Sequence, residues 1–322
     1  MKVGNIMKSN SREYLQPIGA MLELTSNCNL RCSHCYVSAG ENNYKKELSD
    51  DQWLKLLKDL LDQGISSILL TGGEPLIKMD LVKKMINLLS KYPNVQINIA
   101  SNGFLINEEF LKYFNKTPNK KLIQISIDGA YSELHDNVRK VKGSWHKAIQ
   151  ACVLISNYEI EFQIAHTVNK NNIYAINEIF ELGAILGVGS LIIGAAVPLG
   201  RGYSDVDGII LSIEERKNLD ILLENKKKEY SGIVQAYITS CGGDKYYTEF
   251  INYYQDWLLV KSDGNVKLEN RLPFIVGNVK NMSINEIWTK LNSKQKSTRI
   301  ISMINDCIIN NKEIDNQEFI FI

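Results

Sequence analysis

Three cysteines are the residues of this chain best placed to do chemistry together. Cys28, Cys32 and Cys35 have the spacing Cys-x3-Cys-x2-Cys, in a chain that contains 6 cysteines. A disulfide would leave one thiol over, and a zinc site usually takes its four ligands from two separated pairs. A cubane iron–sulfur cluster held by three cysteines fits the spacing better. Its fourth iron would lack a protein ligand, and such an open position usually serves a substrate or cofactor.

The bulk composition excludes several classes of protein. The chain has 322 residues, of which 23% are charged, and a net charge of +1. This balance provides no strong field for nucleic acid or an anionic membrane, so we expect neither as a partner. The N-terminal segment contains no long apolar run, so we expect no signal peptide, no membrane span and a cytoplasmic location. Cytoplasmic thiols stay reduced, which favours a metal site over a disulfide.

The segments that must position the cysteines alternate between strand-like and helix-like patterns. We expect strands near residues 19–25, 65–74, 95–103, 121–129, 159–169, 190–198 and 233–240, with helices between them. The first helix, near residues 48–64, is amphipathic, with Ser49 as its N-cap and Gln52 completing a capping box. Right-handed crossovers between such strands build a parallel sheet, either an open stack or a barrel. We therefore expect an α/β fold.

Motifs rich in cysteine, glycine and polar residues follow each of the first four predicted strands. Cys28 follows the first strand, and Thr71-Gly-Gly-Glu-Pro75 ends the second. Ser101-Asn-Gly103 and Asp128-Gly129 follow the third and the fourth. Parallel sheets bind ligands at the carboxyl ends of their strands. We therefore expect these motifs and the cysteines to form one site.

Taken together, the three cysteines and the Gly-Gly-Glu-Pro motif resemble the radical S-adenosylmethionine (SAM) enzymes. The segment ending in Arg139 and the PLGRG segment at residues 198–202 add to the resemblance. It implies a partial (β/α)6 barrel over residues 18–232, after an N-terminal extension of residues 1–17. It also implies one [4Fe-4S] cluster held by the three cysteines, with SAM chelated to the open iron. An external electron donor of flavodoxin or ferredoxin type would trigger cleavage of SAM to a 5′-deoxyadenosyl radical, which takes a hydrogen atom from the substrate.

The resemblance further implies a set of SAM contacts at the strand ends. The glycines would let backbone approach the methionine part, and the carboxylate would accept from its ammonium group. Arg139 would clamp the SAM carboxylate, unless it forms a surface ion pair. A simple turn or a core position would equally explain the serine and asparagine residues. The expected contacts are Tyr36, Gly72, Gly73, Glu74, Ser101, Asn102, Ser126 and Arg139.

The C-terminal part, residues 233–322, resembles a SPASM domain, which in related enzymes carries additional iron–sulfur clusters. Asp263-Gly264 between apolar runs predicts a hairpin turn, in keeping with that small α+β fold. The position where the family places a cysteine ligand holds Glu269, and the last cysteine-rich stretch is reduced to Cys307. Two remaining thiols cannot hold a cubane alone. We expect a SPASM-like fold without an auxiliary cluster; the alternative is one poorly ligated cluster using Cys241, Glu269 or a thiol from a partner protein.

Without an auxiliary cluster, a redox-neutral reaction is easier than a two-electron oxidation. Peptide epimerases of the family return a hydrogen atom from a cysteine thiol. Cys241, after the last predicted strand and before two glycines, is our candidate for this catalytic donor. A structural cysteine is the alternative role, and cross-linking of peptide side chains is the alternative reaction.

The expected substrate is a ribosomally made peptide undergoing maturation. The segment before the first strand is too short for a leader-binding domain, so we expect a separate leader-peptide-binding protein or a leader strand added to a sheet edge. A small-molecule radical enzyme, such as a carbohydrate dehydratase or dehydrogenase, would use the same barrel. A non-catalytic cluster-binding scaffold is the third alternative, which the intact motifs disfavour.

Anaerobic reconstitution tests the number of clusters. We expect about four irons per chain, the content of one cubane. Replacement of Cys28, Cys32 or Cys35 by alanine should abolish the cluster because the lost ligand has no substitute, whereas Cys152→Ala should retain it. Iron analysis and electron paramagnetic resonance of the reduced protein measure both. A content near eight irons would show that the C-terminal part holds a second cluster.

Overall fold

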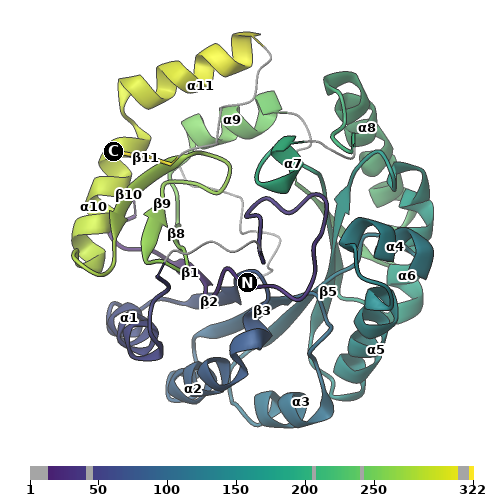
Figure 1. Cartoon of the computed structure of the whole chain (residues 1–322), viewed down its shortest axis with the longest axis horizontal. Coiled ribbons are helices and arrows are strands. Elements are labelled where there is room, and N and C mark those ends of the chain that lie inside the picture. Colours follow the sequence, from purple (N-terminus) through teal and green to yellow (C-terminus); the bar gives the residue numbers. More distant parts are fainter. Residues whose placement is uncertain (1–13, 41–45, 205–207, 240–242, 311–318) are drawn as a thin grey trace.

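A computed structural model describes residues 14–40, 46–204, 208–239, 243–310 and 319–322. Its strands curve into an open ring with helices on the outside (Figure 1). Neighbouring strands pair in parallel and in chain order from the first to the seventh. These strands are β1 (Gly19–Glu23), β2 (Ser67–Thr71), β3 (Gln96–Ser101), β4 (Lys121–Ser126), β5 (Phe162–Val168), β6 (Ser190–Ala195) and β7 (Gln235–Ile238). The predicted α/β barrel-like sheet is confirmed.

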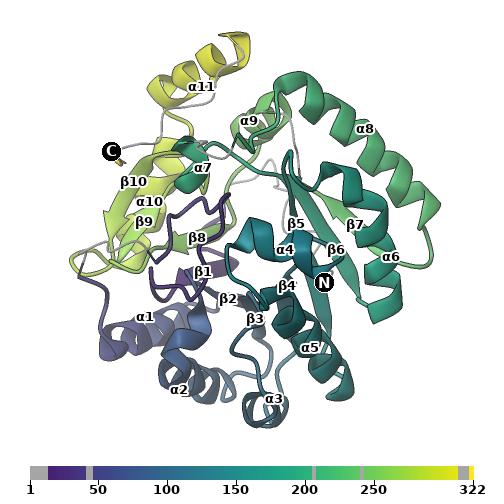
Figure 2. The same ribbon diagram turned by 45° about the vertical axis from the view of Figure 1, so that its right-hand side comes forward.

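Helices connect these strands and cover the outer face of the ring, as Figure 2 shows most clearly for β4 to β6. The capping box predicted at the start of α1 is present, with Ser49 and Gln52 bonded reciprocally. The segment ending in Arg139 forms an additional helix, α4, that the strand and helix pattern did not predict. The helices are α1 (Asp50–Asp62), η2 (Pro75–Lys78), α2 (Met79–Leu89), α3 (Glu108–Asn115), α4 (Ser132–Arg139), α5 (Ser144–Asn157), η3 (Ile173–Ala175), α6 (Ile176–Leu186), α7 (Arg201–Ser204) and α8 (Ile213–Glu229).

The C-terminal part continues the same sheet on the other side of β1. Strand β8 (Trp257–Val260) pairs in parallel with β1, and β9 (Asn265–Lys267) pairs antiparallel with both β8 and β10 (Phe274–Asn278). Gly264 has a φ of +88° in the predicted hairpin turn, a conformation that favours glycine. The apolar C-terminal segment adds β11 (Ile320–Phe321). Helices α9 (Gly243–Asn252), α10 (Ile284–Gln295) and α11 (Thr298–Asn310) complete this part.

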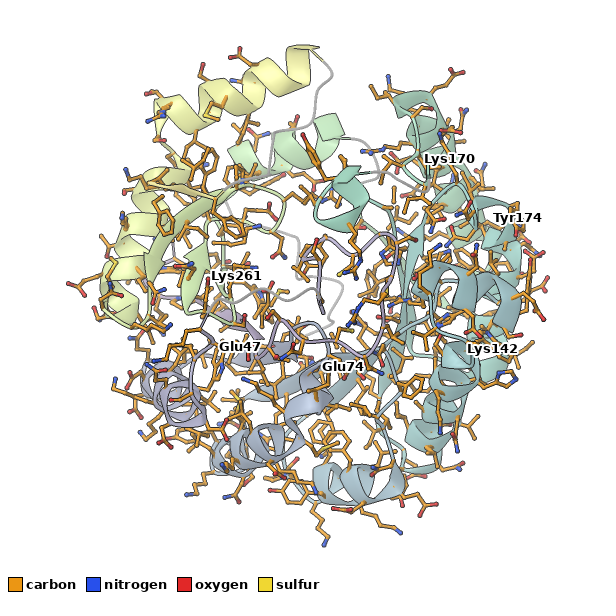
Figure 3. The ribbon with its side chains drawn as sticks, in the orientation of Figure 1. Glu47, Glu74, Lys142, Lys170, Tyr174 and Lys261 are labelled. Carbon is orange, nitrogen blue, oxygen red and sulfur yellow. The ribbon has the colours of Figure 1, made fainter. Side chains whose placement is uncertain are left out.

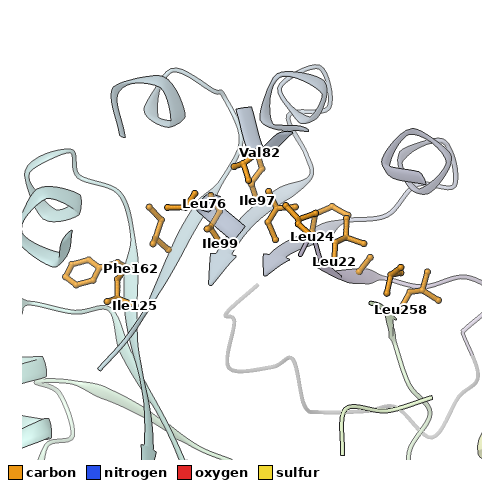
Figure 4. Close-up of a cluster of buried hydrophobic side chains, with 14 of the residues drawn as sticks. Leu22, Leu24, Leu76, Val82, Ile97, Ile99, Ile125, Phe162 and Leu258 are labelled. Atoms are coloured by element: carbon orange, nitrogen blue, oxygen red, sulfur yellow. The ribbon is translucent and has the colours of Figure 1, made fainter. Parts of the chain in front are cut away.

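The two faces of the strands differ in chemistry. Side chains such as Leu22, Ile97 and Ile99 are fully buried between the sheet and the outer helices (Figure 4). Residues of the opposite face point into the ring, because neighbours along a strand alternate. On that face Gln163 donates to Gln124 Oε1 at 2.9 Å, and Ser190 donates to Gln163 Oε1 at 3.2 Å. The interior face is therefore polar at this level of the ring.

Two sequence expectations about burial and membranes can be compared with the fold. Cys152 is fully buried on α5, as expected of a core residue. Among the described residues no helix combines the length and the apolar character needed to cross a membrane.

Loss of a core side chain should destabilise the sheet–helix interface. Ile99→Ala is expected to lower the free energy of unfolding by about 2–5 kcal/mol, because it removes buried methylene groups and leaves a cavity. Ile185→Ala is the matched control, because Ile185 is 81% exposed on α6 and its loss should change stability by less than about 0.5 kcal/mol. Urea denaturation of both variants measures the difference. Equal effects would contradict the assignment of this interface as the core.

Candidate active site

The cluster loop, residues 24–40, leaves β1 and is held against the end of β2 by backbone hydrogen bonds. Leu24 N donates to Thr71 O at 2.8 Å, Gly73 N to Thr25 O at 2.7 Å, and Glu74 N to Asn27 O at 2.9 Å. These bonds continue the β1–β2 pairing beyond the strands. They bring the first cysteine next to the Gly-Gly-Glu motif, as the sequence predicted.

The two glycines of this motif are required by the approach of the cluster loop itself. A Cβ at Gly72 would lie 2.5 Å from Thr25 O, and one at Gly73 would lie 2.2 Å from Asn27 O. Gly72 also has a φ of +149°, which side chains rarely allow. Contact with the methionine part of SAM, predicted for both glycines, stays a prediction. The close contact seen here is a separate physical reason for glycine at both positions.

Each of the three thiols receives a hydrogen-bond donor. Leu30 N lies 3.4 Å from Cys28 Sγ, Ala39 N lies 3.3 Å from Cys35 Sγ, and Arg139 Nη1 lies 3.6 Å from Cys32 Sγ. Donors of this kind stabilise cysteine sulfur bound to iron and tune its reduction potential. In the described ranges no three His, Cys, Asp or Glu side chains lie close enough to share one metal ion. A cubane makes no such demand, because each cysteine binds its own iron, so the donor set fits the cluster.

Burial makes these thiols weak acids in the absence of iron. It raises the pKa of Cys28 to about 11, although the N–H of Leu30 acts in the opposite direction. Burial likewise raises the pKa of Cys32, while the charge of Arg139 opposes it. Thiolates at these positions need a compensating positive charge. Binding of iron would supply that charge and release protons.

Glu74 joins the ends of β2 and β3 from a fully buried position. Its Oε1 accepts from Leu76 N at 3.1 Å and from Ser101 Oγ at 3.0 Å, and its Oε2 accepts from Asn102 N at 2.8 Å. Burial raises the pKa of Glu74 to about 7, although these hydrogen bonds favour the ionised form. The carboxylate thus positions the neighbouring strand end, and Oε2 retains acceptor capacity for the predicted SAM ammonium.

Ser101 and Asn102 take part in the site in different ways. Ser101 Oγ donates to Glu74 and accepts from Gly103 N at 3.0 Å, so its hydroxyl stabilises the turn after β3. Asn102 Nδ2 donates to Asn29 Oδ1 at 2.9 Å and lies 3.8 Å from Cys28 Sγ. Ser126, at the end of β4, is half-buried, and its hydroxyl has no partner within the described residues. The predicted SAM contacts of these three residues stay predictions.

Arg139 belongs to a buried ion-pair network, so the surface ion pair offered as the alternative is wrong, while its predicted contact with the SAM carboxylate stays a prediction. Its side chain is 9% exposed, and Nε lies 2.7 Å from Asp128 Oδ2, although the N–H is not aligned for a hydrogen bond. His34 Nε2 lies 2.6 Å from the same oxygen. Burial by itself would raise the pKa of Asp128, but the charges of Arg139 and His34 hold it well below its usual range. The network links β4 to the cluster loop.

Sequence reasoning underrated several residues of this site. The sequence showed Asp128 only as part of a strand end, and no local pattern assigned a role to His34, whose side chain is 11% exposed. Arg201 lies in the PLGRG segment noted in the sequence. Its Nε donates to Cys32 O at 2.8 Å and its Nη1 to Ala39 O at 2.9 Å, so it holds the cluster loop from the side of β6. The spacing of neighbouring residues could not have indicated these contacts, because the partners are far apart in the sequence.

Further charged residues surround the cluster loop. Glu47 accepts from Thr25 and Ser26 at the start of the loop and pairs with Lys78 at 2.8 Å. Figure 3 shows Glu47, Glu74 and Lys261 around the interior of the ring. Lys261 pairs with Glu23 at 3.0 Å. Both acidic and basic side chains therefore lie near the start of the cluster loop, and they are paired with each other.

Of the residues named in the sequence as possible ligands of an auxiliary cluster, the structure describes Glu269. Glu269 is 9% exposed and accepts from Arg271 N at 2.5 Å. Nearby Lys267 is also buried, and burial lowers its pKa to about 8. Tyr36 is 38% exposed, and its predicted contact with SAM stays a prediction. Cys241 lies outside the described residues, as does the side chain of Cys307.

Comparison with known proteins agrees with this geometry. The family described as the radical SAM superfamily matches residues 22–183. Sporulation killing factor maturation protein SkfB of Bacillus subtilis (strain 168) is 30% identical over 66% of this chain and 51% of its own. An AdoMet-dependent heme synthase of Methanosarcina barkeri is 31% identical over 56% of this chain and 51% of its own. The chain thus spans about half the length of these curated relatives.

Solved structures share the fold at low sequence identity. Streptococcus suis SuiB, solved with bound S-adenosylmethionine, aligns with a TM-score of 0.71 at 15% identity, over 88% of this chain and 69% of its own. Native anSMEcpe with bound AdoMet aligns with a TM-score of 0.66 at 21% identity, over 86% of this chain and 82% of its own. Both alignments extend well beyond the range matched by the family, into the C-terminal part.

The buried carboxyl of Glu74 predicts a pH effect in the cluster-free protein. Its pKa of about 7 when folded exceeds its ordinary value of 4.5, so the folded state keeps a proton that the unfolded state has lost. Stability should therefore fall as the pH rises from 4.5 to 7, by at most about 3 kcal/mol. Glu74→Gln cannot titrate, and its free energy of unfolding relative to wild type should rise over this interval. Urea denaturation at several pH values measures the difference; parallel curves would show that Glu74 titrates normally.

Proposed function

The chain belongs to the radical SAM superfamily, and from this premise we propose that it modifies a ribosomally made peptide, by epimerising a residue or by cross-linking side chains. The support comes from two relatives of Bacillus subtilis: SkfB, named as a maturation protein of the sporulation killing factor, and AlbA, named as a biosynthesis protein of the bacteriocin subtilosin. SuiB, which shares the fold, was also solved with its precursor peptide SuiA. The SuiB structure names a peptide directly, and the two other names state the maturation or biosynthesis of a product.

The family's cofactors, a [4Fe-4S] cluster and SAM, match the donors of the described site. Cys28, Cys32 and Cys35 would hold the cluster, each with a hydrogen-bond donor at its sulfur. When bound, the two groups supply a radical that takes a hydrogen atom from the substrate. The cysteine-bearing loop is held at β2 by Gly73 and Glu74, and near β6 by Arg201.

The surrounding residues orient the site and set its electrostatics. Asn102 and Arg139 direct N–H groups at the sulfurs of Cys28 and Cys32, which stabilises negative charge on them. Asp128 keeps Arg139 in place from a fully buried position. Glu74 Oε2 and the hydroxyl of Ser126 are the acceptors we assign to SAM. Residues that are themselves held in place, as Arg139 is by Asp128, keep reacting groups in a productive geometry.

The residues near the C-terminal hairpin support a redox-neutral outcome. Glu269, at the position where the resemblance predicts a cysteine ligand, is buried, as is nearby Lys267. Without a second electron acceptor, a hydrogen atom must return to the substrate radical. We assign that return to Cys241, which makes epimerisation the favoured reaction and cross-linking the alternative.

The relatives named as heme synthases support a competing substrate class, a tetrapyrrole. Their identity to this chain is similar to that of the peptide-maturing relatives, so sequence identity alone does not separate the two. Incubation with a short peptide encoded beside the gene, and separately with an iron tetrapyrrole, distinguishes them by the mass of the product. A modified tetrapyrrole with an unchanged peptide would overturn the proposal.

Deuterated water tests the role of Cys241. A thiol exchanges its proton with solvent, so the epimerised residue should carry one deuterium. Cys241→Ala should still cleave SAM and abstract hydrogen but should yield no inverted residue, whereas Cys152→Ala, in the core, should behave as wild type. Mass spectrometry and chiral amino-acid analysis of the peptide measure this. A product that lacks solvent deuterium, or has lost two hydrogens, would favour cross-linking.

A further inference from the structure

The segments around the cluster loop carry a local excess of positive charge. Residues 28–40 and 137–158 contain five lysine and arginine residues and no aspartate or glutamate. The whole chain has 37 basic and 36 acidic residues, so this excess is not a general property of the protein. Four of the five cations are exposed, and we call them the basic face: Arg31, Lys140, Lys142 and Lys147.

The two segments are in direct contact at the cluster loop. Arg31 N donates to Arg139 O at 3.2 Å, and Ser33 N donates to Val138 O at 3.0 Å. The last carbonyls of α4 therefore hold the loop. Lys140 directly follows Arg139, whose Nη1 lies 3.6 Å from Cys32 Sγ. Lys140 of the basic face is thus the neighbour in sequence of a residue that contacts a predicted cluster ligand.

The carboxylates that border these segments leave Lys142 and Lys147 without a charged partner among the described residues. Asp128 is buried and already paired with Arg139 and His34. Asp136 accepts from Gly143 N at 2.6 Å and from Trp145 N at 2.8 Å, so it satisfies the N-terminus of α5.

Lys142 and Lys147 have no carboxylate within 4.0 Å in the part of the chain that the structure describes. Figure 3 shows Lys142 at the outer edge of the molecule, directed away from the interior of the ring.

We propose that the basic face docks the acidic one-electron carrier, of flavodoxin or ferredoxin type, that reduces the cysteine site. The inference rests on the proposed function, because only a redox-active group at these cysteines needs such a carrier. One electron leaves the reduced centre of the carrier and enters the group held by the cysteines, with no bond made or broken. Opposite charges on the two surfaces speed the encounter and orient the carrier. The outer position leaves the interior of the ring to SAM and substrate.

Charge reversal on the basic face tests the docking. Cluster-loaded protein is titrated calorimetrically with oxidised flavodoxin, and separately with oxidised ferredoxin, at low ionic strength. Lys142→Glu with Lys147→Glu should weaken binding of the carrier at least tenfold, and salt should weaken wild-type binding because exposed charges are screened. The control is Lys227→Glu with Lys228→Glu, an equal change of charge at exposed positions on α8, which should bind as wild type.

A chemical reductant separates this inference from the proposed function. Dithionite should reduce the cluster and support SAM cleavage equally in wild type and both double variants, while reduction by flavodoxin should slow only in the Lys142/Lys147 variant. Equal weakening by both double variants, no weakening by either, or no binding of any carrier to wild type would overturn the docking site. Failure of dithionite to support SAM cleavage in wild type would overturn the proposed function instead.

Discussion

The site depends on the close backbone contact between the cluster loop and the turn after β2. Thr25 O and Asn27 O approach Gly72 and Gly73 so closely that a Cβ at either glycine would overlap them. The same carbonyls accept the N–H groups of Gly73 and Glu74. Backbone groups that cannot reach water must find such partners, so this contact both satisfies them and sets the start of the loop. The position of all three cysteines follows from where the loop begins.

Around this contact the protein uses buried carboxyl groups to position the loop. Glu74 joins two strand ends through hydrogen bonds, and Asp128 joins Arg139 to His34. A buried ion pair such as that of Asp128 and Arg139 contributes little net stability, because desolvation offsets the attraction. The value of both carboxyl groups here is geometric, since each one links the loop or its neighbour to a different strand. Removal of one partner would leave an uncompensated charge, which is far more costly than the pair is favourable.

The C-terminal part adds to the barrel by direct strand pairing. Strand β8 pairs in parallel with β1, so the interior of the ring continues past the strand that carries the cluster loop. Lys267 and Glu269 are buried in this part, and Glu269 holds the position at which the resemblance to a SPASM domain predicted a cluster ligand. The seventh parallel strand, β7, lies beyond the predicted boundary at residue 232 yet pairs with β6. Strand pairing therefore crosses the boundary that sequence motifs suggested.

Local patterns were sufficient for much of this protein. The spacing of Cys28, Cys32 and Cys35, the glycine motif after β2 and the alternation of apolar segments predicted the cluster site, the parallel sheet and the capping box of α1. These features depend on neighbours in sequence: a capping box spans four residues, and strand ends gather at one edge of any parallel sheet.

Tertiary structure decided what each polar residue contacts. The ion pair that the sequence allowed for Arg139 at the surface is instead buried, with Asp128 as its partner, and His34 contacts the same carboxylate from 94 positions away. Arg201 reaches Cys32 O across 169 positions. A charged side chain shows its type in the sequence but not its partner, because the partner is set by how distant strands and loops pack. The roles of Glu74, Asp128 and Arg139 in positioning the site therefore became visible only in the fold.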